Sequence, residues 1–239
     1  MNHIGQIIHT ISYMVLPLLL AMVFHEYAHG WVADRYGDST ARLEGRLTLN
    51  PVAHIDPFGT ILLPLLCLIF PSGILLGYAK PVPVNAWNLR NPRRDMALVA
   101  AAGPGMNLLL AIASALALSA ILAIDPSVAD SISTGGPGIR RDLLGMILVP
   151  LAWMCTYSVL INVVLLVFNL IPIPPLDGGR IMVSLLPPRQ AEALSRLEPY
   201  GMLIIFFLVV ADPQIHLFGM VMGPLVNALT TTIISTFTS

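Results

Sequence analysis

Two histidines and a glutamate near the start of the chain have the types and spacing of a metal-dependent hydrolase. His25 and His29 lie four residues apart in the segment "HEYAH", and Glu26 follows the first of them. Residues four apart on an α-helix differ by only about 40° in direction, so both imidazoles can face one ion. Glu26 lies about 100° round from His25, close enough to take a proton from water beside that ion. The H-E-x-x-H pattern therefore predicts metal-assisted hydrolysis with Glu26 as general base.

A catalytic zinc ion takes three protein ligands and keeps a fourth position open, so this pair of histidines lacks one partner. We favour Asp177, which lies in the proline-rich segment "NLIPIPPLDGG". Prolines end a helix, and the glycines after Asp177 allow a close backbone approach that would aim the carboxylate at the histidines. The same spacing suits Asp177 as the N-cap of a following helix, and this alternative stays open. The other candidate ligands are Asp56, His54, Glu44, His3 and His9.

The elements that must position these side chains are membrane-spanning helices. Of the 239 residues, 56% are hydrophobic and only 10% are charged, against about 25% charged in a typical soluble domain. The net charge of −1 gives no field that attracts nucleic acid, so we expect the lipid bilayer and no nucleic acid as a partner. Cys67 and Cys155 lie in apolar runs and predict buried thiols rather than a disulfide.

We predict an all-α polytopic membrane protein that forms one integral membrane domain over residues 1–239. The three clearest spans cover residues 7–32, 96–124 and 143–171, and each is long enough for a hydrocarbon core of about 30 Å. One or two further spans are expected near the C-terminus. Ionisable residues within a span are costly and usually functional, which strengthens the metal-site prediction.

Two segments after the first span are expected to lie at or in the membrane without crossing it. Apolar and polar residues alternate in "ARLEGRLTLN", residues 41–50, which predicts a small membrane-associated β-hairpin. Residues 58–78 are apolar but broken by prolines, and basic residues flank them on both sides. Because positive flanks prefer the cytoplasm, we interpret this segment as re-entrant, with one ordinary crossing as the alternative.

The basic residues also predict the orientation of the chain. With the N-terminus outside, the first span enters the cytoplasm near Arg35, and only Arg140 and Arg141 of the twelve Lys and Arg residues lie outside. The predicted active site then faces the cytoplasmic side of the membrane.

Several separate motifs resemble the site-2 protease family of intramembrane zinc metalloproteases and together cover most of the chain. "HEYAHG" is similar to the family's zinc-binding helix, and "NLIPIPPLDGG" to its second signature, in which the aspartate is the third ligand. "GYAKPVPVN" is similar to a membrane-embedded loop of the family, "AAGPGMNLLLA" to its G-P-x-x-N helix, and "GRLTLNPVAHIDPFGT" to the stretch after the zinc helix in short bacterial members. No polar stretch is long enough for a PDZ or CBS domain, so we expect a short bacterial-type member.

The resemblance implies a three-helix catalytic core and one zinc ion per chain, bound by His25, His29 and Asp177. It implies a bacterial inner-membrane enzyme that hydrolyses a peptide bond within or near the transmembrane segment of a membrane-protein substrate.

Three asparagines are candidate substrate-binding residues in this interpretation: Asn85, Asn169 and Asn107. The alternatives are a turn cap for Asn85 and a hydrogen bond between helices for Asn169. His54 is interpreted as a hydrogen-bonded loop residue, with an auxiliary metal or gating role as the alternative.

Three other functions are alternatives: a membrane metal transporter or sensor, a catalytically inactive substrate-binding relative, and a membrane hydrolase of lipids or prenylated proteins. A transporter needs polar ligands along a path through several spans, whereas the sequence offers one cluster. Intact His25, Glu26 and His29 argue against an inactive relative, and "PPLDGG" favours the protease over a lipid hydrolase.

Overall fold

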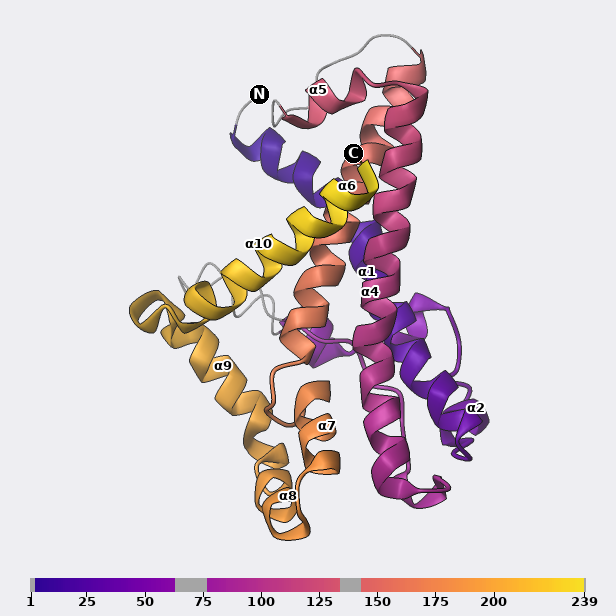
Figure 1. Ribbon diagram of the computed structural model, residues 1–239, viewed down its shortest axis with the longest axis vertical. Coiled ribbons are helices and arrows are strands. Elements are labelled where there is room, and N and C mark those ends of the chain that lie inside the picture. Colours follow the sequence, from indigo (N-terminus) through magenta and orange to yellow (C-terminus); the bar gives the residue numbers. More distant parts are fainter. Residues whose placement is uncertain (1–2, 63–76, 134–142, 239) are drawn as a thin grey trace. The chain divides into compact units, whose positions relative to one another are not determined.

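The computed structural model describes residues 3–62, 77–133 and 143–238, and the regular structure of these residues is entirely helical (Figure 1). Among these residues, four helices contain stretches long and apolar enough to cross a membrane: α1 (His3–Arg35), α4 (Pro92–Ile124), α6 (Leu143–Asn169) and α10 (Leu217–Thr238). The pair α8 (Pro188–Ser195) and α9 (Glu198–Ile215), bent by 61°, gives a fifth candidate if it forms one span. These helices confirm the prediction of a multi-pass, all-helical membrane protein.

Shorter elements connect the spans in the described residues: α2 (Thr40–Leu43), η1 (Pro51–His54), η2 (Pro57–Leu62), η3 (Ala86–Asn88), α5 (Val128–Ser133) and α7 (Asp177–Leu185). The predicted re-entrant segment at 58–78 falls mostly on residues 63–76, which lie outside the described residues. Its first residues form part of η2, a short π-type helix.

The predicted β-hairpin over residues 41–50 is wrong, because this segment contains the end of α2 and a loop, and no strand occurs in the described chain. Gly45 has a φ of +66° and follows the last turn of α2. The N–H of Arg46 donates to Ala41 O at 2.8 Å, and the N–H of Gly45 donates to Arg42 O at 3.0 Å. This pair of hydrogen bonds is the Schellman arrangement that closes a helix. The glycine therefore ends a helix where the alternation of residue types predicted a turn between strands.

The helix α4 begins four residues before the predicted span. Pro92 occupies its first position, where the missing N–H costs nothing. Asp95 reaches back and accepts a hydrogen bond from the N–H of Asn91 at 2.7 Å. This capping contact stabilises a polar first turn that hydropathy alone does not detect.

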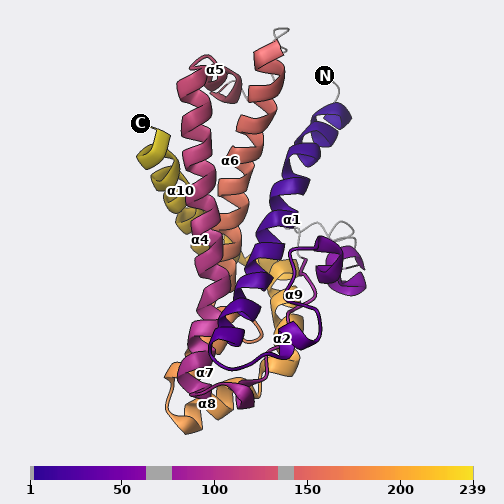
Figure 2. The ribbon, with the colours of Figure 1, turned by 90° about the vertical axis from the view of Figure 1, so that its right-hand side faces the viewer.

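The chain divides into two compact units. The first consists of Met1–Ala21, Asn107–Val164 and Val226–Ser239. Within it α4 and α6 lie side by side (Figure 2), around an apolar cluster made of Leu118, Val128, Leu148, Val149 and Ala152.

A polar ladder also joins α4 to α6 inside this first unit. Asn107 Nδ2 donates to Asn162 Oδ1 at 2.9 Å, and the hydroxyl of Ser114 donates to that of Ser158 at 2.8 Å. Asn107 and Asn162 are almost fully buried. Buried amides in lipid need partners, and here each supplies the other.

The second unit, Met22–Met106 and Leu165–Leu225, contains all residues of the predicted metal site. A buried carboxylate, Asp38, organises the segment that follows α1. It accepts hydrogen bonds from Thr40, from the backbone N–H of Asn85 at 2.6 Å and from Asn88 Nδ2 at 3.0 Å. Burial raises the pKa of Asp38, but these hydrogen bonds outweigh burial and hold that pKa below its ordinary value. The loop from residue 77 to 85 is thereby fixed at its C-terminal end.

Candidate metal centre

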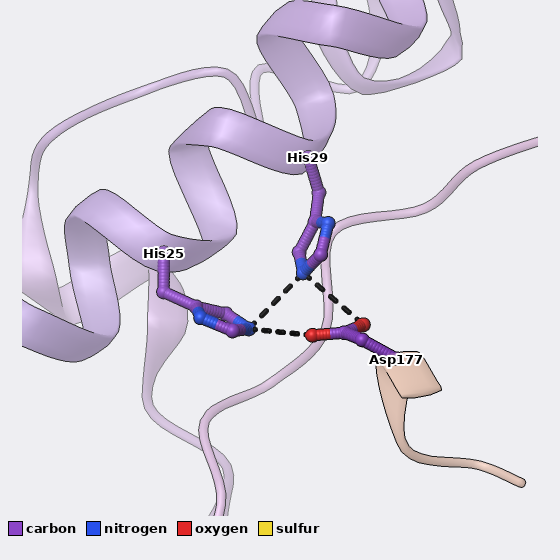
Figure 3. A group of neighbouring side chains, drawn as sticks. All are labelled: His25, His29 and Asp177. Carbon is purple, nitrogen blue, oxygen red and sulfur yellow. Dashed lines mark hydrogen bonds and ion pairs between the residues drawn. The ribbon is translucent and has the colours of Figure 1, made fainter. Parts of the chain in front are cut away.

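Two helices bring His25, His29 and Asp177 together (Figure 3). Both histidines project from one side of α1, as their spacing predicts, and Asp177 is the first residue of α7. The two Nε2 atoms are 3.0 Å apart. The carboxylate oxygens of Asp177 lie 3.2 Å from His25 Nε2 and 3.3 Å from His29 Nε2. All three side chains are buried.

A turn joins α6 to α7 (Figure 1), and the first residue of α7, Asp177, directs its carboxylate at the histidines (Figure 3). Helix α6 ends at Asn169, and the proline-rich turn precedes α7. A Cβ atom on Gly178 would overlap the carbonyl groups at the end of α6, and one on Gly179 would overlap the backbone of Pro174. Only glycine allows α7 to pack this closely on the turn. Leu176, not Asp177, is the N-cap residue, and no side-chain capping bond forms there, so the N-cap alternative is wrong.

The three side chains fit a zinc ion. Zinc bonds nitrogen and oxygen ligands at about 2.0–2.2 Å in a tetrahedral arrangement, which places ligand atoms about 3.3–3.5 Å apart. The distance between the two Nε2 atoms, 3.0 Å, and the distances from them to the carboxylate oxygens, 3.2 Å and 3.3 Å, are close to this spacing. Asp177 Oδ2 is also buried without a hydrogen-bond donor, although such atoms normally have one. Among the described residues, this is the only group of three or more His, Cys, Asp and Glu ligands within bonding range of one ion.

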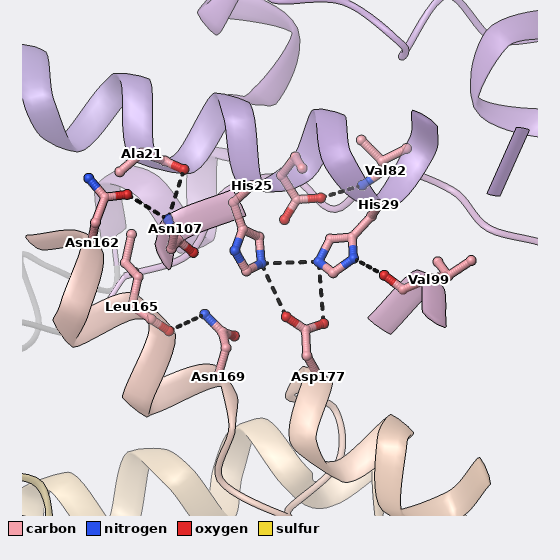
Figure 4. Close-up of polar contacts among 11 residues, drawn as sticks. Ala21, His25, His29, Val82, Val99, Asn107, Asn162, Leu165, Asn169 and Asp177 are labelled. Atoms are coloured by element: carbon pink, nitrogen blue, oxygen red, sulfur yellow. Dashed lines mark hydrogen bonds and ion pairs between the residues drawn. The ribbon is translucent and has the colours of Figure 1, made fainter. Parts of the chain in front are cut away.

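The helix α4 fixes the ring of His29. Its Nδ1 atom lies 2.7 Å from the carbonyl oxygen of Val99 (Figure 4). A carbonyl only accepts, so Nδ1 carries the hydrogen and the lone pair of neutral His29 lies on Nε2, facing His25 and Asp177. This is the usual orienting contact of a metal-binding histidine.

Glu26 lies beside the centre and is not one of its three clustered ligands. Its Oε2 atom accepts a hydrogen bond from the backbone N–H of Val82 at 2.8 Å. Val82 belongs to the loop "GYAKPVPVN", which is held also by Lys80, whose N–H donates to His54 O at 2.8 Å. The loop therefore packs against the H-E-x-x-H segment through the glutamate itself.

A cavity of about 310 Å³ opens at the cluster. Its walls include His25, Glu26, His29, Asn169, Asp177 and Arg180, together with apolar side chains of the loop and of α4. A mostly apolar lining with a few placed polar groups is typical of a ligand-binding site.

The other candidate ligands lie elsewhere or outside the described side chains. His54 is buried, and its Nε2 donates to the carbonyl of Thr48 at 2.9 Å, which agrees with the interpretation as a loop residue. Asp56 accepts hydrogen bonds from the N–H groups of Phe58 and Gly59. The described metal cluster contains neither Asp56 nor the exposed Glu44. The side chains of His3 and His9 are outside the described part of the chain.

Of the three asparagines predicted to bind substrate, the structure places one in the wall of the cavity. Asn169 lines the cavity, while its Nδ2 donates to Leu165 O at 3.0 Å within α6. Asn85 Oδ1 accepts from the N–H of Trp87 and caps η3, which is the turn-cap alternative. Asn107 is buried in the first unit.

Sequence reasoning missed three contacts of this centre, and two of them are made by backbone. The Val82 N–H and the Val99 carbonyl are backbone groups, which residue type does not reveal. The third is Gly103 on α4, which lies against both imidazoles. Its signal was the glycine itself, since a glycine within a long helix often marks a close approach.

Comparison with known proteins agrees with this geometry. The model of the Peptidase family M50 matches residues 13–212. The chain belongs to peptidase family M50. It is 37% identical over 227 residues to "Putative zinc metalloprotease YwhC" of Bacillus subtilis (strain 168), a match that covers 95% of this chain and 91% of YwhC. The resemblance to site-2 proteases is therefore confirmed, and the protein is a member of a family of zinc metalloproteases.

More distant relatives carry the same kind of name. The chain is 31% identical over 198 residues to "Putative zinc metalloprotease Rip2" of Mycolicibacterium smegmatis, and 29% identical over 194 residues to the Mycobacterium tuberculosis protein of that name. These matches cover 80% and 81% of this chain but only 64% of each Rip2 protein. No solved structure matches the chain.

Proposed function

We propose that this M50 protein hydrolyses a peptide bond within or near the transmembrane segment of a membrane-protein substrate, at the centre formed by His25, His29 and Asp177. The observation that carries the proposal is the convergence of these three ligands beside Glu26, in the wall of a cavity that also has apolar lining residues. The whole chain, residues 1–239, acts as one metalloprotease domain, with α1, α4 and α6 as its three-helix core.

His25, His29 and Asp177 would hold the zinc ion through two nitrogens and one oxygen. When bound, zinc supplies a Lewis acid that polarises the scissile carbonyl and lowers the pKa of a water molecule to about 7. The two imidazoles bind as neutral ligands, and His29 is held in the required tautomer by Val99.

Glu26 moves the proton. Its carboxylate takes a proton from the water that attacks the carbonyl carbon, and passes it to the amide nitrogen as the C–N bond breaks. The Val82 N–H, 2.8 Å from Oε2, holds the carboxylate in place for both transfers. Asn169, in the cavity wall, hydrogen-bonds the substrate backbone. Substrate binding by Asn85 and by Asn107 stays a prediction.

The substrate helix must unwind before its carbonyl can be attacked, because helical carbonyls are hydrogen-bonded and shielded by side chains. Unwound backbone in lipid needs new partners. In the loop from residue 77 to 85, the N–H groups of Tyr78, Lys80, Val82 and Asn85 are already bonded within the protein. The carbonyls of Tyr78, Lys80 and Pro81 already accept one hydrogen bond each, from Thr60 and Arg46, and keep a second lone pair for a substrate N–H. A helix-breaking residue near the cut should therefore speed cleavage, whereas a rigid poly-leucine helix should resist it.

We place the protein in a bacterial inner membrane with its N-terminus outside and the centre toward the cytoplasm. The support is the charge pattern: all but two of the twelve Lys and Arg residues then lie on the cytoplasmic side. Water and zinc reach the centre from that side.

Metal analysis of the purified protein beside its Asp177→Ala variant tests the centre. The wild-type chain should hold one zinc ion, and the variant should lose both zinc and the cleavage of a transmembrane peptide. Retention of stoichiometric zinc by Asp177→Ala would remove Asp177 from the site. Zinc binding without any proteolysis by the wild-type chain on a panel of transmembrane peptides would instead favour the inactive relative.

A further inference from the structure

Helix α4 places a glycine directly against the metal-binding edges of both histidines. A Cβ atom built on Gly103 would overlap His29 Nε2, and it would lie 2.6 Å from His25 Nε2 and 2.5 Å from His25 Cε1. Real Cβ atoms essentially never approach another heavy atom this closely. Any side chain at position 103 therefore displaces one or both imidazoles.

The side chains that this Cβ would displace are the ones that bind the ion. Each imidazole must keep its Nε2 atom about 2.0–2.1 Å from a bound zinc ion, and the Cβ would press on both Nε2 atoms. We infer that Gly103 is a positioning residue of the metal centre, whose missing side chain lets α4 pack against both imidazoles without displacing them. The inference rests on the proposed function, because it concerns the same zinc ion.

Displacing either ring disturbs contacts of the metal centre. Val99, one turn before Gly103 on the same face of α4, holds Nδ1 of His29 at 2.7 Å. His25 Nε2 lies 3.0 Å from His29 Nε2 and 3.2 Å from Asp177, so a shift of this ring changes the spacing of all three ligands. Helix α4 therefore contributes twice to the centre: the Val99 carbonyl orients His29, and Gly103 one turn later leaves room for both imidazoles.

Gly105 is a matched control for this idea. It lies two residues further along α4, and a Cβ atom there would meet nothing within 4 Å. Alanine favours the helix over glycine at both positions. Only the contact with the imidazoles distinguishes Gly103→Ala from Gly105→Ala.

The test is zinc binding by the purified full-length chain, measured as metal content and as affinity in competition with a chromophoric chelator. The wild-type chain and Gly105→Ala should each bind one zinc ion with the same affinity. Gly103→Ala should bind zinc at least tenfold more weakly, because disturbing contacts that orient metal ligands typically costs about 10–100-fold in affinity. Wild-type affinity in Gly103→Ala would overturn the inference and leave the proposed function standing. A wild-type chain that binds no zinc would overturn the proposed metal centre, and the inference with it.

A second comparison decides the case in which Gly103→Ala does not fold. The substitution is repeated in a chain that carries His25→Ala and His29→Ala, which lacks both colliding rings. Gly103→Ala should then leave the melting temperature of that chain unchanged or higher, and such rescue would locate the damage in the contact with the imidazoles. Equal damage in both backgrounds would overturn the inference.

Discussion

Glu26 has two contacts that can be separated by substitution, and this gives the sharpest test of its role. The carboxylate faces the cavity at the metal centre, and its Oε2 atom binds the loop through the N–H of Val82. Glu26→Gln keeps an oxygen that accepts from Val82 but cannot accept the proton of water. Glu26→Ala removes both. The two variants should therefore be equally inactive but differently stable.

The expected magnitudes follow from the two contacts. A positioned general base contributes about 10²–10⁴-fold to a rate, so both variants should lose at least about 100-fold in kcat. A hydrogen bond to a charged group contributes about 1.5–3 kcal/mol and a neutral one about 0.5–1.5 kcal/mol. Glu26→Gln should thus cost about 1 kcal/mol of stability, and Glu26→Ala about 1.5–3 kcal/mol.

The assay is cleavage of a labelled transmembrane peptide in detergent micelles, with zinc content and thermal unfolding measured on the same preparations. Both variants should retain about one zinc ion per chain, because Glu26 is not among the three clustered ligands. Loss of zinc from Glu26→Gln would make the residue structural for the metal. Wild-type rates in Glu26→Gln would refute its role as base, and equal stability of the two variants would refute the contact with Val82.

Four further outcomes are expected. Asp38→Asn should make the stability of the protein less dependent on pH in the acid range. A carboxyl whose pKa is lowered in the folded state stabilises the fold above about pH 4 and loses that contribution as the pH falls further. The unfolding midpoint, measured as a function of pH, tests this. Asn162→Leu should lower stability by about 0.6–1.7 kcal/mol through the lost bond to Asn107, with zinc content unchanged. Gly179→Ala should lower zinc occupancy, because its Cβ would push α7 off the preceding turn and carry Asp177 with it. Removal of zinc by a chelator should lower the melting temperature reversibly, since free zinc at 100 times its Kd stabilises the bound fold by about 2.7 kcal/mol.

The sequence patterns that predicted helices and ligands correctly were either long apolar runs or combinations of residues that rarely occur by chance. Hydropathy located the long helices because each apolar run exceeds what one span needs, and the H-E-x-x-H spacing placed two imidazoles on one side of α1. The proline and glycine residues around Asp177 predicted a broken helix end, and the structure has a turn there with α7 packed tightly on it. These features depend on local chain geometry, which the sequence encodes directly.

The hairpin prediction failed for a reason that is also local. Alternation over ten residues is a weak signal, and it competed with a helix end at Gly45 that makes the same residues part of a helix and a loop. The contacts of Val82 and Val99 could not be predicted at all, because a backbone N–H or carbonyl is present at nearly every position. Which one meets Glu26 or His29 depends on how segments distant in sequence pack.

The charges of the centre explain why Asp177 needs a cation and Glu26 needs a hydrogen-bond donor. With neutral imidazoles, Asp177 and Glu26 place two negative charges in and beside a buried cluster, and burying unpaired charge in lipid is costly. A divalent cation bound to Asp177 brings the sum to zero, and the Val82 N–H gives the other carboxylate a partner that carries no formal charge. A lysine or arginine side chain as this partner would neutralise Glu26 too, but the ion pair would weaken the carboxylate as a base more than one uncharged N–H donor does. A backbone donor positions Glu26 while leaving it free to accept a proton, which is what the hydrolysis requires of it.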